Sequence, residues 1–148
     1  MNVSLKTNIK PLNLLLVEDD DGDAKTLERA FHKARITDYT ISRAVDGTEA
    51  LEMLKGENGK SKPPSPYILL VDLNMPRMNG VQLVKALRGN ENLRRSVVFI
   101  LTTSNREEDR TAAYDLNVAG YITKAAASED LMKLVTLIDL YRCIVELP

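Results

Sequence analysis

The sequence predicts an α/β fold built on a doubly wound, open parallel sheet, and three observations support this. Five short apolar or β-rich segments alternate with segments whose apolar residues recur at helical spacing, which is typical of a parallel sheet covered by helices. The segment 67–71 (YILLV) is apolar throughout, as expected of a strand in the centre of such a sheet. The 148 residues suit one globular domain.

The first half of the chain predicts two further strands and two helices. Residues 12–17 (LNLLLV) are an apolar run that ends in acids, and 39–44 (YTISRA) is β-rich and alternating. Between these strands, 21–34 has the apolar spacing of an amphipathic helix, and 48–54 predicts a short second helix. The Gly-, Pro- and Ser-rich segment 56–66 predicts a loop before the central strand.

The second half predicts two more strands and three more helices. Strands are expected at 97–101 (VVFIL) and 120–123 (GYIT), and helices at 81–87 and 107–117. Residues 128–147 predict one long final helix, because a serine followed by two acids is a typical helix start.

Composition excludes several classes of protein. The formal net charge of -1 argues against nucleic-acid binding, and one cysteine excludes an intrachain disulfide. No apolar run reaches the roughly 18 residues of a membrane span, and residues 1–11 lack the apolar stretch of a signal peptide. We therefore expect a cytoplasmic protein without nucleic-acid or membrane partners.

Polar residues follow four of the predicted strands. Glu18 and Asp19 follow the first strand, Asp72 the third, Thr102 the fourth and Lys124 the fifth. The carboxyl ends of parallel strands meet at one edge of the sheet, where such folds bind ligands. We therefore expect a carboxylate cluster with a hydroxyl and an ammonium at its rim.

This set of groups suits phosphoryl transfer. Close carboxylates repel one another, and Mg²⁺ relieves that repulsion while accepting phosphate oxygens. A carboxylate beside the cation can act as the nucleophile that forms an aspartyl phosphate. A hydroxyl and an ammonium would then bind phosphoryl oxygens by hydrogen bonds.

The segments LLLVEDD, LLVDLNMPRMNG, FILTTS and GYITK resemble the receiver domain of two-component response regulators, and the resemblance covers residues 12–147. It implies a flavodoxin-like, CheY-like (βα)5 three-layer sandwich with strand order 2-1-3-4-5. It also divides the chain into an N-terminal extension, 1–11, and a receiver domain, 12–148.

The resemblance implies roles for four residues around Mg²⁺. Asp72 resembles the phospho-acceptor and a metal ligand, and Asp19 resembles the acid that binds Mg²⁺ directly. Glu18 matches the acid that acts through water, and Asn74 the position whose backbone carbonyl binds the metal.

Three further residues match the switch of the family. Thr102 and Lys124 resemble the phosphate-binding residues, and Tyr121 the aromatic residue that turns inward on activation. Ala125 departs from the pattern, because the family usually has a proline after the lysine, often with a cis bond. A non-proline cis bond costs about 3 kcal/mol, so either the bond is trans and the loop differs, or the loop is strained.

The loop 56–66, the LTTS motif and the ending 141–148 (YRCIVELP) resemble a narrower group, the stand-alone regulators associated with bacterial phytochromes. This implies a sensor histidine kinase as partner, a bacterial phytochrome in that group. It also implies a signalling protein without an output domain, a phospho-acceptor rather than an enzyme, with slow autodephosphorylation. Because apolar residues of 128–147 spread beyond one stripe, we expect homodimerisation through this helix.

Three alternative functions match parts of the acidic segment less well. In a haloacid-dehalogenase-like phosphatase Asp19 would be the nucleophile of a D-x-D-G motif, but Asp72 would go unexplained and Asp23 stands where a hydroxyl is preferred. A calcium loop would need glycine and glutamate where Ala24 and Ala30 stand. A flavin- or dinucleotide-binding module would need a phosphate-accepting loop after the first strand, where the acids would repel phosphate.

Overall fold

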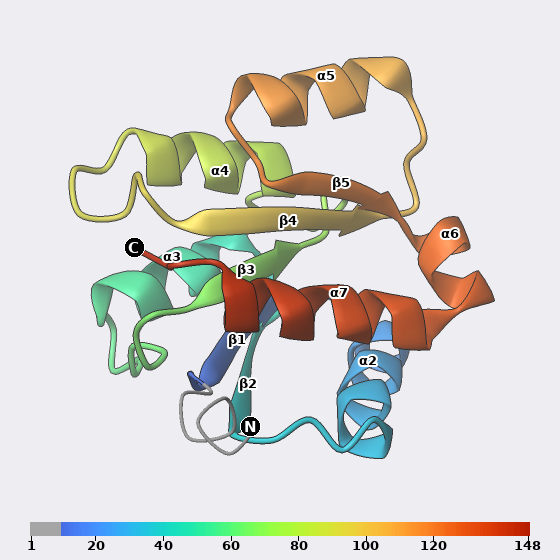
Figure 1. Ribbon diagram of the computed structural model, residues 1–148. Helices are drawn as coiled ribbons and strands as arrows, with labels where there is room; N and C mark the ends of the chain where they lie inside the picture. Colours follow the sequence, from blue (N-terminus) through green and yellow to red (C-terminus); the bar gives the residue numbers. More distant parts are fainter. Residues whose placement is uncertain (1–9) are drawn as a thin grey trace.

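A five-stranded parallel sheet organises the chain. The structure, a computed structural model, describes residues 10–148. Its strands lie in the order β2-β1-β3-β4-β5, which confirms the predicted fold and strand order (Figure 1). The strands are Leu12–Val17 (β1), Tyr39–Ala44 (β2), Ile68–Val71 (β3), Val97–Thr102 (β4) and Gly120–Thr123 (β5). Most of the predicted N-terminal extension, residues 1–9 of 1–11, lies outside the described residues.

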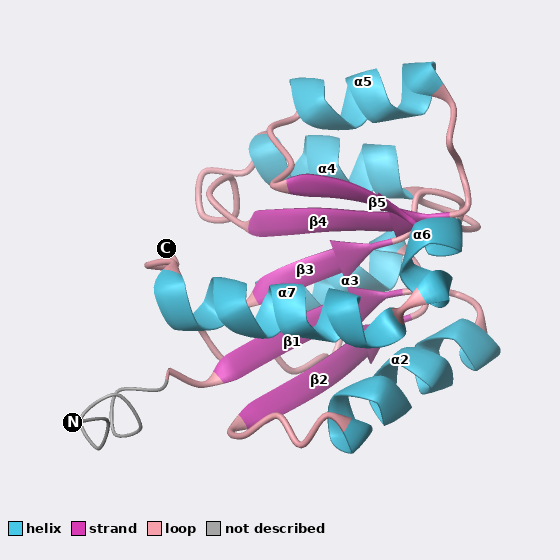
Figure 2. Cartoon of the chain, turned by 45° about the vertical axis from the view of Figure 1, so that its right-hand side comes forward, coloured by secondary structure: helices cyan, strands magenta, loops and turns pink. Residues whose placement is uncertain are grey.

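Helices cover both faces of the sheet and complete a three-layer sandwich (Figure 2). Helices α2 (Asp21–Lys33) and α7 (Leu131–Ile144) pack on one face, and α3 (Gly47–Lys55), α4 (Gly80–Arg88) and α5 (Glu107–Asp115) on the other. Within residues 10–148, no helix combines the length and the apolar character that crossing a membrane requires.

The central strand β3 shows how the sequence builds two cores at once. All four of its residues are buried. Because side chains alternate along a strand, Leu69 and Val71 join the cluster under α3, α4 and α5, whereas Ile68 and Leu70 join the cluster under α2 and α7. Because both faces of β3 are buried, its sequence is an apolar run and not an alternation of apolar and polar residues.

The C-terminal region differs from the prediction of one helix over 128–147. A short helix, α6 (Lys124–Glu129), precedes α7. The two helices are separated by Asp130, whose backbone is not helical, with φ of -151° and ψ of 85°. Ser128 caps nothing; it lies inside α6, and its hydroxyl donates to the Ala125 carbonyl at 3.0 Å. The Thr123 side chain caps α6 instead. Three successive alanines follow in this helix, and alanine is the residue with the highest helix propensity.

A buried arginine anchors α7. Arg142 is only 2% exposed, and its guanidinium donates to the carbonyls of Lys10, Thr37 and Asp38 and pairs with Asp139. It thereby ties α7 to the segment before β1 and to the loop before β2. The helical spacing of apolar residues did not predict this, because arginine is polar and seldom fully buried.

Gly80, the first residue of α4, lies against the backbone that carries Asp72. Its N–H donates to the Leu73 carbonyl at 3.0 Å. A Cβ at this position would overlap the Asp72 carbonyl oxygen and lie 2.8 Å from the Leu73 Cα. Since both contacts are with backbone, no side-chain rotation would relieve them.

We therefore predict that Gly80→Ala lowers the free energy of unfolding by about 1–3 kcal/mol, the usual range for overpacking. Gly89→Ala is the matched control, because its Cβ would meet its nearest neighbour at an ordinary 3.5 Å and its φ is -83°. Urea unfolding of both variants measures the difference. Equal stability of the two would contradict the close approach of α4 to the Asp72 backbone.

Candidate functional site

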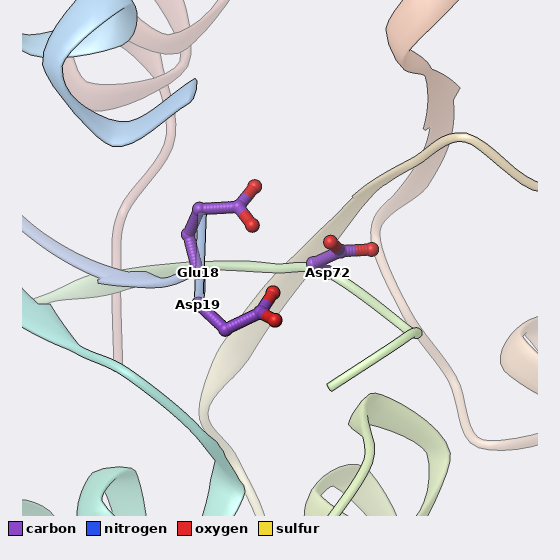
Figure 3. Close-up of side chains that lie close together, drawn as sticks. All are labelled: Glu18, Asp19 and Asp72. Carbon is purple, nitrogen blue, oxygen red and sulfur yellow. The ribbon is translucent and has the colours of Figure 1, made fainter. Parts of the chain in front are cut away.

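Three carboxylates meet at the carboxyl ends of β1 and β3. Glu18 and Asp19 follow β1 directly, and Asp72 follows β3. Carboxylate oxygens of the three lie within 4.8 Å of one another, and Figure 3 shows the three side chains close together. Glu18 and Asp72 are buried, whereas Asp19 is exposed. The predicted acidic cluster is therefore formed by neighbouring strands of the sheet.

Lys124 supplies the positive charge that this cluster needs. It is the first residue of α6, directly after β5. Its Nζ lies 2.6 Å from Glu18 Oε1, 2.7 Å from Asp23 Oδ2 and 3.2 Å from Asp72 Oδ2. The three protons of the ammonium can thus each be donated to a different carboxylate.

The environment shifts the pKa values of two of these groups. Burial raises the pKa of Glu18 to about 7, although hydrogen bonds from Lys124 and from the Asp20 N–H oppose this. Burial alone would lower the pKa of Lys124, but hydrogen bonds to Asp23 and Glu18 and the charge of Asp72 outweigh it and raise that pKa. Lys124 therefore stays charged, while the Glu18 carboxyl titrates near neutrality.

Arg43, near the end of β2, holds the loop that carries the acids. Its Nε and one terminal nitrogen donate to the Glu18 carbonyl at 3.0 and 2.9 Å, and its other terminal nitrogen donates to Asp21 at 2.7 Å. Sequence reasoning missed this residue. The available signal was an arginine in the otherwise uncharged strand segment YTISRA.

Thr102 and Asn74 occupy their predicted positions at the strand ends. Thr102 is the last residue of β4 and is fully buried, and its hydroxyl accepts the Ser104 N–H at 3.3 Å. The N–H of Asn74 donates to Asp72 Oδ1 at 3.2 Å, so the backbone after β3 folds back toward the carboxylate.

Tyr121 connects β5 to the loop after β4. Its hydroxyl donates to the Ser104 carbonyl at 3.0 Å, and its N–H donates to the Tyr114 hydroxyl at 3.2 Å. The half-buried ring packs against the core under α3, α4 and α5. Thr102 and Tyr121 therefore share Ser104 as a neighbour, a link that no sequence signal indicated.

The departure at Ala125 is resolved in favour of a trans bond. Within residues 10–148 the only cis peptide bond is Ser65–Pro66. A residue before proline is kept out of the helical region of φ and ψ, whereas Ala125 leaves Lys124 free to begin a helix. In this chain α6 begins directly at Lys124.

The donor set fits a small, hard divalent cation. Carboxylate oxygens are the preferred ligands of Mg²⁺ and Mn²⁺, and those of Glu18, Asp19 and Asp72 lie close enough to share one ion. The calcium-loop alternative does not fit, because Asp21 and Asp23 lie in the first turn of helix α2 and not in a loop. Their carboxylates bond Arg43 and Lys124, respectively.

Comparison with known proteins gives a consistent family. A family model described as "Response regulator receiver domain" matches residues 14–136. Response regulator Rcp1 of Synechocystis sp. is 34% identical over 125 residues, which cover 84% of this chain and 84% of Rcp1.

Solved structures of similar proteins agree. The Mn(2+)-bound form of response regulator Rcp1 superposes with a TM-score of 0.79 at 31% identity, covering 94% of this chain and 99% of that one. The phosphorylated cyanobacterial phytochrome response regulator RcpA superposes with a TM-score of 0.79 at 31% identity, covering 91% of this chain and 96% of that one.

The raised pKa of Glu18 predicts pH-dependent metal binding. A cation competes with the proton on this carboxyl, so the affinity should fall as pH drops below about 7, by up to about tenfold per pH unit, and level off above it. Titration with Mn²⁺, followed by electron paramagnetic resonance from pH 5.5 to 8, measures this.

Glu18→Gln is the matched control, because it keeps the shape of the side chain and removes the titrating proton. Its profile should lack the inflection near pH 7. An inflection of equal size in both proteins would show that another group controls metal binding.

Proposed function

The chain belongs to the response regulator receiver domain family, and we propose that it accepts the phosphoryl group of a sensor histidine kinase on Asp72. The family match spans residues 14–136, and two-component signalling is the role of this family. The observation that supports Asp72 most directly is its carboxylate, buried at the end of β3 beside two acids and 3.2 Å from an ammonium.

The chemistry follows from this geometry. An Asp72 carboxylate oxygen attacks the phosphorus of the kinase phosphohistidine, the phosphorus–nitrogen bond breaks, and the imidazole leaves with its electron pair. The oxygens of Asp72, Asp19, Glu18 (through water) and the Asn74 carbonyl would hold Mg²⁺, which neutralises charge on the transferred group. Transfer needs little beyond this positioning.

Thr102 and Lys124 would bind the new phosphoryl oxygens. Such binding favours one of two arrangements of the surface, as a population shift requires. Because the Thr102 hydroxyl accepts the Ser104 N–H, and Tyr121 donates to the Ser104 carbonyl, a shift of Thr102 would reach Tyr121 through the same loop.

We further infer the biological setting from the relatives. The similarity to Rcp1 and RcpA, the latter described as a phytochrome response regulator, supports a phytochrome-type kinase as the partner. On this proposal residues 12–148 are the receiver, preceded by the extension 1–11. The protein works in the cytoplasm as a phospho-acceptor, not an enzyme, and it slowly loses its own phosphoryl group.

Asp72→Asn should abolish phosphorylation by acetyl phosphate in the presence of Mg²⁺, because an amide cannot act as the carboxylate nucleophile. Intact-protein mass spectrometry measures the added phosphoryl group, and omission of Mg²⁺ should prevent it in the wild type. Asp115→Asn, an exposed acid at the end of α5, is the matched control and should be phosphorylated normally.

The same experiment tests the nucleophile itself. Labelling that persisted in Asp72→Asn would place the acceptor elsewhere and contradict the proposal. The phosphatase alternative, with Asp19 as nucleophile, finds no support in the comparisons, which match the receiver family across most of the chain.

The outer face of α7 supports a second part of the proposal, homodimerisation. Four large apolar side chains on this helix are exposed: Met132, Leu137, Leu140 and Ile144. Leu137, Leu140 and Ile144 follow one another at three- and four-residue spacing, so they form one ridge. Contiguous exposed apolar surface is typical of a protein interface, and a second copy of the same helix presents a complementary ridge.

Leu140→Glu should therefore turn a dimer into a monomer without lowering the melting temperature of the protomer, because this side chain is half exposed. Light scattering at high micromolar concentration, with and without a phosphoryl analogue, measures the mass. Thr111→Glu, an exposed position on α5, is the control and should leave the mass unchanged. A wild type that stays monomeric under both conditions would disprove dimerisation.

A further inference from the structure

Lys124 is held by an acid that belongs to none of the roles described above. Its Nζ lies 2.7 Å from Asp23 Oδ2, as close as it lies to Glu18, but it lies 3.2 Å from Asp72. Asp23 is on the first turn of α2, the helix that follows β1. The ammonium therefore lies nearer to this acid of α2 than to the carboxylate that would carry the phosphoryl group.

When a divalent cation is bound, Asp23 would be the carboxylate that attracts the Lys124 ammonium most strongly. Glu18, Asp19 and Asp72 are the carboxylates close enough to share an ion. Once their oxygens face a divalent cation, their attraction for a second cation falls. Asp23 lies outside that group, so its contact with Lys124 would survive metal binding.

The surroundings of the Asp23–Lys124 pair leave room for movement. The two residues line a half-open cavity of about 180 Å³ whose other walls include Leu16, Leu27 and Leu101. The aliphatic stem of Lys124 thus borders open space instead of close-packed side chains. Because Nζ already lies 3.2 Å from Asp72 Oδ2, only a short shift separates Asp23 from a group on Asp72.

We propose that Asp23 is a positioning residue that holds Lys124 back from the phosphoryl group on Asp72. The inference rests on the proposed function. In the metal-bound, unphosphorylated protein Asp23 retains the ammonium at the α2 side. A phosphoryl oxygen on Asp72 must then compete with this ion pair for Lys124, so Asp23 acts as a brake on the switch.

A purely local role for Asp23 makes a different prediction. An acid in the first turn of a helix stabilises it through the helix dipole, and removal of any negative charge nearby would favour an anionic ligand. Neither effect requires Lys124. A double-mutant cycle between positions 23 and 124 therefore separates the brake from simple electrostatics.

Calorimetry at saturating Mg²⁺ measures the binding of beryllofluoride, which is an analogue of the aspartyl phosphoryl group. Asp23→Asn should bind it about two- to five-fold more tightly than wild type, the range expected for one half-exposed ion pair. In the Lys124→Met background Asp23→Asn should change the affinity for beryllofluoride by a smaller factor than it does when residue 124 is lysine. Asp23→Glu, which retains the carboxylate, should behave like wild type.

Asp21→Asn is the matched control for charge. Asp21 is also on the first turn of α2, but its carboxylate bonds Arg43 and not Lys124. Any change of affinity in this variant should be the same whether residue 124 is lysine or methionine. Tightening by Asp23→Asn that persisted in full in Lys124→Met would overturn the proposal.

A second measurement does not depend on the Lys124 variant folding. The ¹⁵Nζ signal of the Lys124 ammonium, recorded by nuclear magnetic resonance with Mg²⁺ alone, should be protected from exchange with water in the wild type. That protection should be lost in Asp23→Asn and return when beryllofluoride is added. Equal protection in the two proteins before addition would overturn the role of Asp23.

The two proposals fail differently. A wild type that bound no beryllofluoride with Mg²⁺ present would overturn the proposed function together with this inference. A wild type that bound it with unchanged affinity in Asp23→Asn would overturn the role of Asp23 alone.

Discussion

The ammonium of Lys124 is the interaction on which the candidate site depends. Glu18 and Asp72 are buried beside each other, and two neighbouring carboxylates in a partly desolvated place repel strongly. A single ammonium, carried by the residue after the edge strand β5, donates to both and to Asp23 and so offsets that repulsion. On the proposed mechanism the same cation would move when a phosphoryl group arrives, so stability and switching would depend on one side chain.

The scaffold brings these groups together through the parallel sheet. Strands β1, β3, β4 and β5 all end at the same edge; β1, β3 and β5 are each followed at once by a residue of the site, and β4 ends on Thr102. The backbone around them is held from both sides. Arg43 fixes the Glu18 carbonyl from β2, and Gly80 lets α4 approach the backbone of Asp72 as no larger residue could. The site is therefore rigid at its acids and adjustable at Lys124.

Much of the candidate site was predictable because its chemistry is local to strand ends. A buried strand followed by acids, as at Val17–Glu18–Asp19 and Val71–Asp72, marks a position by its contrast of polarity. Thr102 follows the same logic. Asp23 does not, because an acid in the first turn of a helix is ordinary, and only its distance from Lys124 distinguishes it from Asp20 and Asp21.

By itself the sequence determined the succession of strands and helices along the chain as far as β5, the apolar centre of the sheet and the residues at its carboxyl edge, because these depend on short-range pattern. Only the tertiary structure decided where the last helix divides, that Arg142 is buried, and that Lys124 is shared by three acids. The last two depend on partners distant in sequence: Arg142 bonds the Lys10 carbonyl, and Lys124 bonds Glu18. A pattern of neighbouring residues carries no information about such contacts.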